Sequence, residues 1–210
     1  MELPQEMRLA EVEFASDADL RAIRAWAHAP RSGASQKALD AAEYAGLALE
    51  KLEMSRQRGR LARSLDELRR ALAQAHQNRR TPEIIALLAA RADWHRPAAT
   101  LGFCLFRRSW AHNLFVDYLG TDPRQHEPGA APIKGVGTGL LYGVMGSGQE
   151  LDAGRCLIEA TDESYWFYRK KFRMTEINDL FALTPAEQWH FMEQTRLTWR
   201  RSAPPAAVTF

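Results

Sequence analysis

Hydrophobic and polar positions repeat with two different periods along the chain, which predicts both strands and helices. Polar and apolar residues alternate over Glu11–Phe14, the period of a half-buried strand. Ser16 is followed three residues later by Asp19, a spacing that predicts a capped helix start before the apolar positions Leu20 and Ile23. The chain is therefore expected to open with a strand and then a helix.

Two more helices are expected before residue 80. A segment rich in Ala, Leu and Glu predicts a helix from about Gln36 to Ser55, and Ser64 with Glu67 predicts the start of the next. Arginines are concentrated over the same region, at Arg56, Arg58, Arg60, Arg63, Arg69, Arg70, Arg79 and Arg80. They favour a solvated helical face, and a patch for an acidic partner or for ligand phosphates is the alternative.

The apolar run Ile84–Arg91 is compatible with either a helix or a buried strand. Thr81 and Pro82 form a good helix start before it, and a run this short does not reveal its period. Two segments rich in aromatic and β-branched residues, TLGFCLFRR and NLFVDYLGT, predict neighbouring antiparallel strands joined by a short polar link.

The last third of the chain predicts a second alternation of helices and strands. After residue 133 the pattern predicts a helix, the turn-rich segment GSGQELDAG, a strand at RCLIEA and a helix around Glu163–Lys171. A strand within Arg173–Leu183 follows. Thr184 and Glu187 then predict the start of a C-terminal helix.

Composition and charge exclude several classes of protein. The chain has 210 residues, enough for one domain with a proper core, and its formal net charge of +2 gives no strong electrostatic bias towards nucleic acid. It has no run of about 18 apolar residues that would span a bilayer, and its start lacks the basic and apolar stretches of a signal peptide. We therefore expect a cytoplasmic protein with neither a membrane nor a nucleic-acid partner.

The sulfur and imidazole side chains indicate no metal chemistry. Cys104 and Cys156 both lie in apolar strand-like runs, which favours two reduced core thiols over a disulfide. The histidines show no metal-ligand spacing, and neither cysteine has a Cys-x-x-Cys partner. No metal site is predicted.

The segment IKGVGTGLLYGV, Ile133 to Val144, places three glycines directly before an apolar run. Glycine has no Cβ, so backbone N–H groups can approach a phosphate closely, and a helix N-terminus adds unpaired donors and a positive dipole end. A Walker loop would require Gly-Lys-Ser/Thr where Gly-Leu-Leu stands, and the third glycine is misplaced for a dinucleotide fingerprint. The segment predicts an anion site, and a loop that packs closely under a strand is the alternative.

Two motifs resemble those of the GNAT superfamily of N-acetyltransferases. GVGTGLL, followed by FYRKKF at residues 167–172, is similar to the family's pyrophosphate loop and its later Tyr-Glu-Lys-x-Gly-Phe pattern. VEFASDADLRAI resembles the family's first strand and helix, and VDYLGTDP its fourth strand, so the resemblance covers most of the chain in order. The chain departs at Pro132, where the family has Gln or Arg, and at Lys171, where it has Gly. The loop Arg124–Pro132 is also longer than usual.

The resemblance implies an α/β (α+β) fold, with a GNAT-like mixed, mostly antiparallel twisted sheet, flanking helices and an extra N-terminal helical insertion. It implies a single acyltransferase domain over residues 1–200, with the insertion at about 34–60 and a flexible tail at 201–210. It also decides Ile84–Arg91 in favour of a strand.

Acetyl-CoA is the co-substrate that the resemblance implies, lying in a cleft where the fourth and fifth strands part. The pantetheine arm would pair with the fourth strand, and the glycine segment would hold the pyrophosphate, with Lys134 supplying positive charge. The implied cofactor-binding residues are Leu119, Gly120, Thr121, Lys134, Gly135, Val136, Gly137, Thr138 and Gly139.

Catalytic roles follow from the same resemblance. Tyr168 matches the family tyrosine near the thioester sulfur, where a phenol can donate a proton, and Asp117 is placed to accept the amine's proton through water. The alternatives are an interfacial tyrosine and a paired structural carboxylate, and Glu159 is the reserve base. No covalent enzyme intermediate is implied.

The implied function is an N-acetyltransferase that moves acetyl from acetyl-CoA to an amine by direct attack in a ternary complex. A non-catalytic acyl-CoA-binding or sensor module of the same fold is the alternative. The acceptor, a small molecule or a peptide or protein amine, stays open, and aromatic candidates for its pocket are Trp26, Tyr44, Trp110, Tyr165 and Trp166. The C-terminal helix, with Trp189, Phe191, Met192 and Trp199, would support a homodimer or simply pack on the core.

Overall fold

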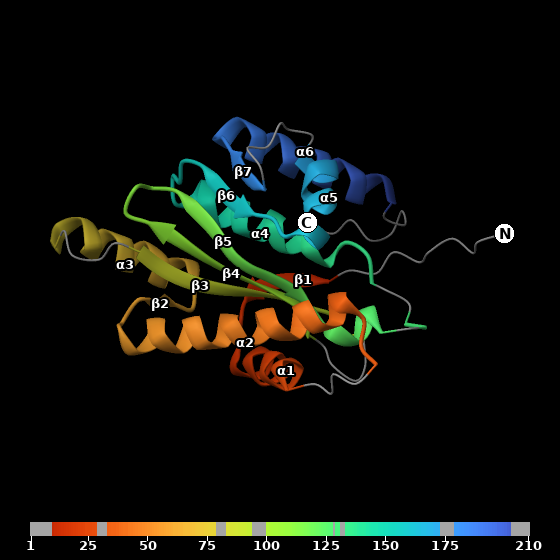
Figure 1. Ribbon diagram of the computed structural model, residues 1–210. Helices are drawn as coiled ribbons and strands as arrows, with labels where there is room; N and C mark the ends of the chain where they lie inside the picture. Colours follow the sequence, from red (N-terminus) through yellow and green to blue (C-terminus); the bar gives the residue numbers. More distant parts are fainter. Residues whose placement is uncertain are drawn as a thin grey trace.

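One twisted sheet with helices on both faces forms the body of the protein (Figure 1). A computed structural model describes residues 10–28, 33–78, 83–93, 100–127, 129–130, 133–172 and 179–202. The strands in this part of the chain are β1 (Glu11–Phe14), β2 (Leu61–Ala62), β3 (Glu83–Arg91), β4 (Thr100–Ser109), β5 (Leu114–Thr121), β6 (Cys156–Glu159) and β7 (Leu180–Leu183). The helices are α1 (Asp17–Ala27), α2 (Gln36–Gln57), α3 (Leu65–Asn78), the short 3₁₀ helix η1 (Pro123–His126), α4 (Val136–Glu150), α5 (Asp162–Phe172) and α6 (Pro185–Ser202).

The sheet is mixed and mostly antiparallel, which confirms the predicted fold class. Its strands follow the order β1-β3-β4-β5-β6-β7, with β2 paired to β3 off this path. Neighbours are antiparallel except at β2–β3 and β5–β6, which are parallel. The run at residues 84–91 is a strand despite its helix-favouring composition, because as a central strand it is buried on both faces.

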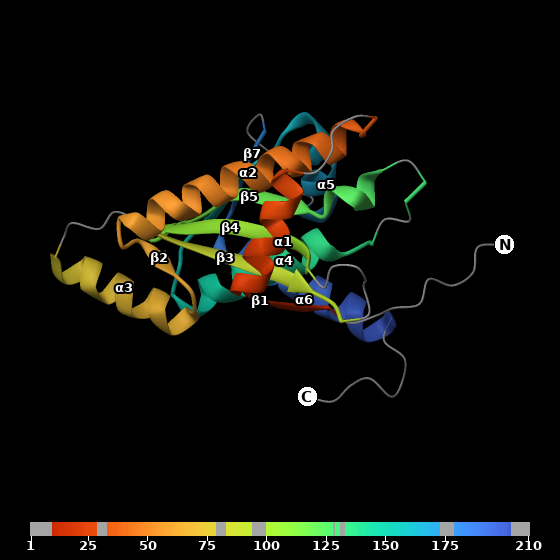
Figure 2. The same ribbon diagram turned by 90° about the horizontal axis from the view of Figure 1, so that it is seen from below.

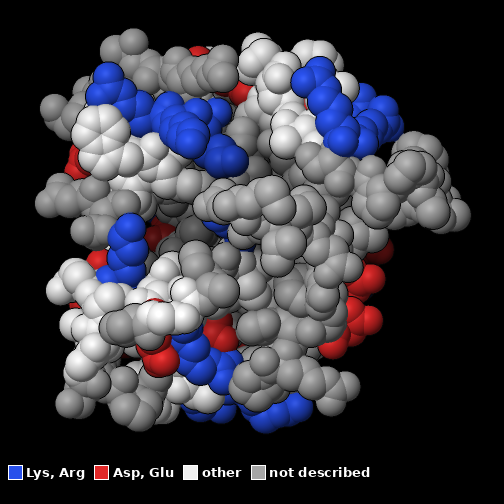
Figure 3. Space-filling model, turned by 90° about the vertical axis from the view of Figure 1, so that its right-hand side faces the viewer, with Lys and Arg blue, Asp and Glu red and all other residues white. Residues whose placement is uncertain are grey.

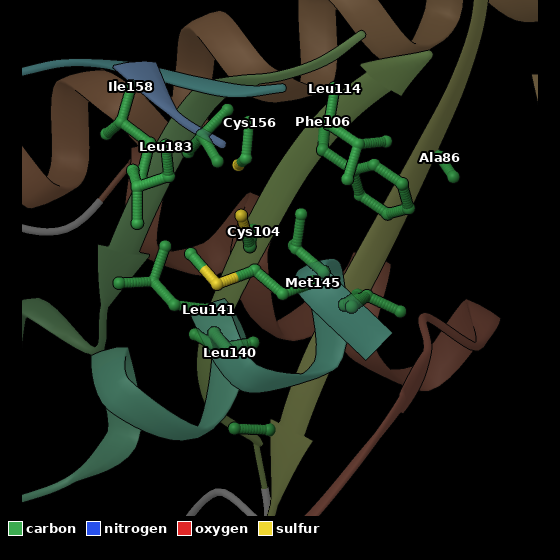
Figure 4. Packing of buried hydrophobic residues seen from close by; sticks show 14 of the residues in the cluster. Ala86, Cys104, Phe106, Leu114, Leu140, Leu141, Met145, Cys156, Ile158 and Leu183 are labelled. Carbon is green, nitrogen blue, oxygen red and sulfur yellow. The ribbon is translucent and has the colours of Figure 1, made fainter. Parts of the chain in front are cut away.

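Each face of the sheet carries its own hydrophobic core. On one face, α1 and α2 pack through Trp26, Ala45 and Leu52 onto Leu87 and Phe103. Figure 2 shows both helices on the near face of the sheet, with α1 across β3 and β4 and α2 along β5. On the other face, α4 and α5 with parts of α3 and α6 cover a larger core, and Figure 4 shows side chains of α4 meeting those of the strands there. The helix predicted at residues 36–55 is confirmed as α2.

Both cysteines lie in the larger core, as predicted. Cys104 on β4 and Cys156 on β6 are fully buried and free (Figure 4). Burial raises the pKa of the Cys156 thiol to about 12 and that of Cys104 well above its usual value. The thiols therefore stay protonated and behave as apolar core groups.

Two boundaries differ from the sequence-based expectation. The predicted turn GSGQELDAG begins inside α4, which continues to Glu150 because its glycines serve packing: a Cβ at Gly148 would lie 2.4 Å from Cδ1 of Leu114. At the C-terminus, α6 runs through Ser202, so the first two residues of the expected tail are helical, and residues 203–210 lie outside the described residues. Within the described ranges, no helix combines the length and the apolar character needed to cross a membrane.

A buried charge network ties the start of α1 to the central strands. The capping box expected at Ser16 is present, and Asp19, only 2% exposed, completes it. The Asp19 carboxylate also accepts hydrogen bonds from Nε of Arg91, at 2.9 Å, and from Oγ1 of Thr100, at 2.9 Å. Burial alone would raise the pKa of Asp19, but the bonds from Arg91, Ser16 and Thr100 outweigh it and lower the pKa to about 2.

Asp19 is expected to make folding stability depend on acid pH. Since its folded pKa of about 2 lies below the ordinary value of 3.8, its contribution is present above pH 3.8 and is lost as the pH falls to 2. The loss should be about 2 kcal/mol in the free energy of unfolding. Urea unfolding of wild type and Asp19→Asn at pH 5 and pH 2.5 measures it. Asp17→Asn, in the same helical turn but exposed, should behave like wild type.

Alanine substitutions at two glycines of α4 should have opposite effects on stability. A Cβ at Gly143 would lie 2.8 Å from Cγ1 of Val12, whereas the nearest atom at Gly146 is Cε of Met192 at 3.7 Å. Alanine is favoured over glycine in a helix by about 1 kcal/mol, so Gly146→Ala should stabilise by up to that amount. Gly143→Ala should destabilise by about 1–3 kcal/mol through overpacking. Equal effects in denaturant unfolding would contradict the close packing of α4 on β1.

Candidate functional site

The sheet opens between β5 and β6. These parallel strands pair only over Leu114–Val116 and Cys156–Ile158. Beyond Val116, β5 continues to Thr121 bonded to β4 alone, and β6 ends at Glu159. Among the described residues, the edge of β5 from Asp117 to Thr121 therefore has no strand partner on the β6 side. Its free main-chain groups can pair with an extended ligand.

A bulge at Asp117 marks the point where the strands part. Leu105 of β4 pairs with Tyr118, but Phe106 pairs with Val116, so Asp117 is an extra residue in β5. The bulge shifts the alternation of side chains between the two faces of the sheet. Val116 belongs to the α4-side core, but Tyr118, two residues later, belongs to the α2-side core, and Leu119 belongs to the α4 side again. Both faces of the sheet thus contribute side chains to the same opening.

The first turn of α4 lies beside this opening and has free backbone donors. Gly135 is its N-cap, with φ of 94°, and no side chain caps the helix. This left-handed conformation favours glycine, and the N–H groups of Val136, Gly137 and Thr138 are left without intrahelical partners. Gly139 differs, because its N–H donates to the Gly135 carbonyl at 2.9 Å.

Gly137, together with Gly102 of β4 and Gly120 of β5, lies where neighbouring side chains pack closely against the backbone. A Cβ at Gly137 would meet Leu119 of β5 and Phe167 of α5, both at 3.5 Å, so these three elements converge at the helix start. A Cβ at Gly102 would lie 2.7 Å from Cγ1 of Val136, and one at Gly120 would lie 2.9 Å from the Phe103 ring. Close packing, the alternative role of the segment, is thus present at Gly137, and the anion site stays a prediction.

The predicted cofactor residues come together at this place. Leu119, Gly120 and Thr121 form the end of β5, and Gly135–Thr138 form the facing turn of α4. Lys134 is exposed just before that turn. Lys171 of α5 lies with Nζ 6.0 Å from the Phe167 ring centroid, and burial, then Lys170, lowers its pKa.

Among the described residues, Lys and Arg outweigh Asp and Glu on the side of the molecule where α4 begins (Figure 3). Figure 3 views this side, and its described Lys and Arg side chains occupy more of the surface than Asp and Glu. A polyanionic ligand would be attracted there. Within the arginine cluster at 56–80, Arg56 pairs with Glu53 and Arg69 pairs with Asp66 and Glu150, whereas Arg79 and Arg80 lie outside the described residues. A patch for a ligand or partner stays the alternative.

Tyr168 lies behind the glycine turn, on the α4 side of the sheet. It is 4% exposed, and its ring packs against Phe167, Phe172 and Phe181 at centroid distances of 5.1, 6.0 and 5.7 Å. Burial raises the pKa of the phenol well above its usual range. No hydrogen bond of its hydroxyl is present in the described part of the chain. The phenol is thus a protonated donor with free capacity.

Asp117 lies on the opposite, α2-facing side of the opening. Its Oδ1 accepts a hydrogen bond from Nε of Arg107 at 2.9 Å, and Nζ of Lys51 lies 3.0 Å from Oδ2. Oδ2 has no hydrogen bond of suitable geometry among the described groups, so its interaction with Lys51 is an ion pair without a hydrogen bond. Arg107 also pairs with Glu83 at 2.8 Å. The carboxylate is held in place by two cations. Glu159, the reserve base, is exposed at the end of β6.

A hydrogen-bonded chain that the sequence did not predict links α2 to the end of β5. Nε2 of His126 and Oγ1 of Thr121 share a hydrogen bond of 2.7 Å, and the Ser35 hydroxyl donates to the His126 carbonyl at 2.6 Å. Ser35 is also the N-cap of α2. The residues are 91 positions apart, so no local signal could have found the link. In the described residues no cluster of His, Cys, Asp or Glu suits a metal ion.

These elements reproduce the arrangement that the resemblance implies, with a parallel pair parting beside a helix entered through glycines. The fold is GNAT-like.

Comparison with known proteins finds likeness only among solved structures, since no protein-family model and no curated protein sequence matches the chain. Nourseothricin acetyltransferase is 20% identical over 47% of this chain and 62% of its own length, with a TM-score of 0.33. The chain thus spans less than two thirds of that protein.

Two further structures match over more of their length. The PaiA N-acetyltransferase of Thermoplasma acidophilum, in complex with coenzyme A, is 18% identical over 83% of this chain and 98% of its own, with a TM-score of 0.43. A protein of Desulfovibrio desulfuricans assigned to the GNAT family of acetyltransferases is 13% identical over 79% and 83%, with a TM-score of 0.44. At these identities and TM-scores, only the geometry of this chain bears on its function.

The first turn of α4 is expected to bind inorganic pyrophosphate. At ten times its dissociation constant, a ligand of the folded state raises the free energy of unfolding by about 1.4 kcal/mol. Thermal unfolding should show this gain for wild type and lose it for Gly137→Glu, whose carboxylate would repel the anion. Gln149→Glu adds the same charge at the other end of α4 and should keep the gain. Equal responses of the two variants would place the anion elsewhere.

Proposed function

We propose that this protein is an acyltransferase that moves an acetyl group from acetyl-CoA to an amine. The observation that carries the proposal is the opening between β5 and β6, with its unpaired strand edge, next to the uncapped glycine turn of α4. An extended arm with amide groups fits the first feature, and a pyrophosphate fits the second. Coenzyme A combines both in one molecule.

The proposed cofactor contacts divide between main chain and side chain. Main-chain groups of Leu119, Gly120 and Thr121 would pair with the pantetheine arm, and N–H groups of Val136, Gly137 and Thr138 would hold the pyrophosphate. Gly135 supplies the left-handed cap that starts the turn. Gly139 allows close packing under Val12 and has no free N–H for a phosphate. Lys134, exposed before the turn, would add positive charge.

The proposed reaction is direct attack in a ternary complex. The amine nitrogen forms a bond to the thioester carbonyl carbon, the carbon–sulfur bond breaks, and coenzyme A leaves as a thiolate. Tyr168 would hydrogen-bond or protonate that thiolate, a role supported by the absence of a hydrogen bond to its hydroxyl among the described residues and by its raised pKa. The proton lost by the amine would pass through water to Asp117 or to Glu159 at the same opening.

A non-catalytic acyl-CoA-binding module of the same fold is the second candidate, and one observation favours it. The Asp117 carboxylate already contacts Arg107 and Lys51. Such pairing is typical of a structural carboxylate and leaves it less able to accept a proton from an amine. A sensor module would bind acetyl-CoA as tightly as the enzyme and would release no thiol when amines are added.

Two further predictions concern the setting of the protein. We propose a cytoplasmic location, which the two free, buried thiols support because disulfides are rare there. A homodimer through α6 also stays a prediction. Phe191 is buried in the core and Trp199 packs on Tyr142 at 5.1 Å, so Trp189, at 58% exposure, is the main residue of that surface left to support it.

Tyr168→Phe is expected to lower kcat about 100-fold while acetyl-CoA binding is unchanged, because a general acid contributes on this order. Since burial raises the pKa of Tyr168, wild-type activity should show no fall near pH 10 from loss of this proton. Thiol release and thermal unfolding with acetyl-CoA measure the two properties. Tyr142→Phe, whose ring lies against Trp199 away from the opening, is the matched control. An unchanged kcat in Tyr168→Phe would remove the tyrosine from the mechanism.

A further inference from the structure

We propose that His126 is a positioning residue for acetyl-CoA, which holds Thr121 and thereby fixes the end of the β5 edge with which the pantetheine arm pairs. This inference rests on the proposed function and deepens it with a residue that lies outside both sequence motifs. His126 belongs to the loop Arg124–Pro132, which is longer than the family pattern, so the inference also gives that loop a role.

The imidazole of His126 cross-links the last residue of β5 to the short helix that follows it. Nε2 of His126 lies 2.7 Å from Oγ1 of Thr121, and both side chains are half-buried. Thr121 is paired with Gly102 of β4, but within the described ranges it has no strand partner on the β6 side. The last residue of a strand that is paired on one side frays easily, because few contacts hold it. The bond to His126 gives Thr121 a second anchor.

The helix η1 gives this imidazole a fixed base. Asp122, only 1% exposed, is the N-cap of η1, and its N–H donates to the Leu101 carbonyl at 3.0 Å. Gln125, which precedes His126 and is also buried, donates from Nε2 to the same carbonyl at 3.2 Å. The short helix is thus fastened to the start of β4 at two points. A side chain can position its neighbour only if its own backbone is held, and η1 meets this condition.

A further attachment joins η1 to the start of α2. The Ser35 hydroxyl donates to the His126 carbonyl at 2.6 Å, and its oxygen accepts a hydrogen bond from the Ala38 N–H at 3.3 Å as the N-cap of α2. The backbone of His126 is therefore held from the β4 side and from the α2 side. The edge of β5 is supported by a helix that the family resemblance treats as an insertion.

The position of Thr121 matters because it lies where the two parts of the proposed cofactor site meet. It is the last residue of the unpaired edge, and its partner on β4 is Gly102. A Cβ at Gly102 would lie 2.7 Å from Cγ1 of Val136, so this residue pair is next to the first turn of α4. A displaced Thr121 would misalign the edge for the pantetheine arm with the turn for the pyrophosphate, and coenzyme A must contact both at once.

Such an anchor acts on cofactor binding and not on the chemical step. A fixed edge stabilises the bound ground state and the transition state equally, so its loss raises the dissociation constant of acetyl-CoA and leaves kcat unchanged. The net contribution of one hydrogen bond corresponds to about fivefold in affinity. Burial, and then the charge of Lys37, lowers the pKa of His126, so the neutral ring can accept the hydrogen of the Thr121 hydroxyl at neutral pH.

The experiment compares the dissociation constants of acetyl-CoA and inorganic pyrophosphate, measured by isothermal titration calorimetry. His126→Leu should weaken acetyl-CoA binding about fivefold. It should leave pyrophosphate binding within twofold of wild type, because pyrophosphate occupies the turn of α4 and has no arm to pair with β5. His126→Gln, whose side-chain amide reaches the place of Nε2, should bind acetyl-CoA within twofold of wild type. His190→Leu makes the same change on an exposed residue of α6 and should alter neither constant.

A double-mutant cycle isolates the bond between the two side chains. Thr121→Val removes the hydroxyl but keeps the shape of the side chain and its preference for a strand. Alone, it should weaken acetyl-CoA binding as much as His126→Leu does. The variant that carries both substitutions should bind no more weakly than either single variant, because both changes remove the same bond.

The outcomes separate this inference from the proposed function. If acetyl-CoA binds to wild type and to His126→Leu equally well, the positioning role is wrong and the acyltransferase proposal stands. If His126→Leu weakens acetyl-CoA and pyrophosphate binding to the same extent, or if the two single variants are additive, His126 supports the fold in general and the inference is overturned. If acetyl-CoA does not bind to wild type at all, the proposed function fails, and the positioning role fails with it.

Discussion

The structure depends on the short pairing between β5 and β6. Three residue pairs hold these parallel strands together, and from Asp117 to Thr121 β5 continues without β6, which ends at Glu159. A sheet that stayed closed would leave no unpaired edge of β5 for a ligand. Because β6 then pairs with β7 on its far side, the strands can part without leaving β6 unsupported.

Glycines at the contacts between helix and sheet determine where α4 lies relative to the opening. Glycine at positions 102 and 120 lets Val136 and the Phe103 ring approach the backbone, and glycine at 143 lets α4 lie directly on Val12. The contacts at Gly102 and Gly143 fix the height of α4 above the sheet. They therefore determine where its first turn lies relative to the free edge of β5, so the packing glycines and the donor glycines of one helix cooperate.

Much of the fold could be predicted from the sequence, because several elements are determined by residues close together in the chain. Ser16 and Asp19 form the expected cap, and the strands around Cys104 and Val116 were recognised from their composition. The run at residues 84–91 needed the family resemblance, since only its central place in the sheet decides it. The end of α4 was missed, because glycines that read as turn residues serve helix packing against Leu114.

The candidate site was predictable only where it is local. The glycine turn could be identified from spacing, but the contacts of Asp117 with Lys51 and of His126 with Ser35 join segments far apart in sequence. Tyr44 could be named only as one of several aromatics, because its contact with Tyr118 depends on how α2 lies over β5.

The two buried cysteines allow separation of the core to be measured by thiol labelling. Cys104 and Cys156 belong to β4 and β6, on either side of β5, and neither is accessible in the folded state. A thiol reagent can reach them only when the sheet separates from α4. The rate at which each cysteine is labelled in native buffer thus measures how often this core unfolds locally. No engineered probe is needed.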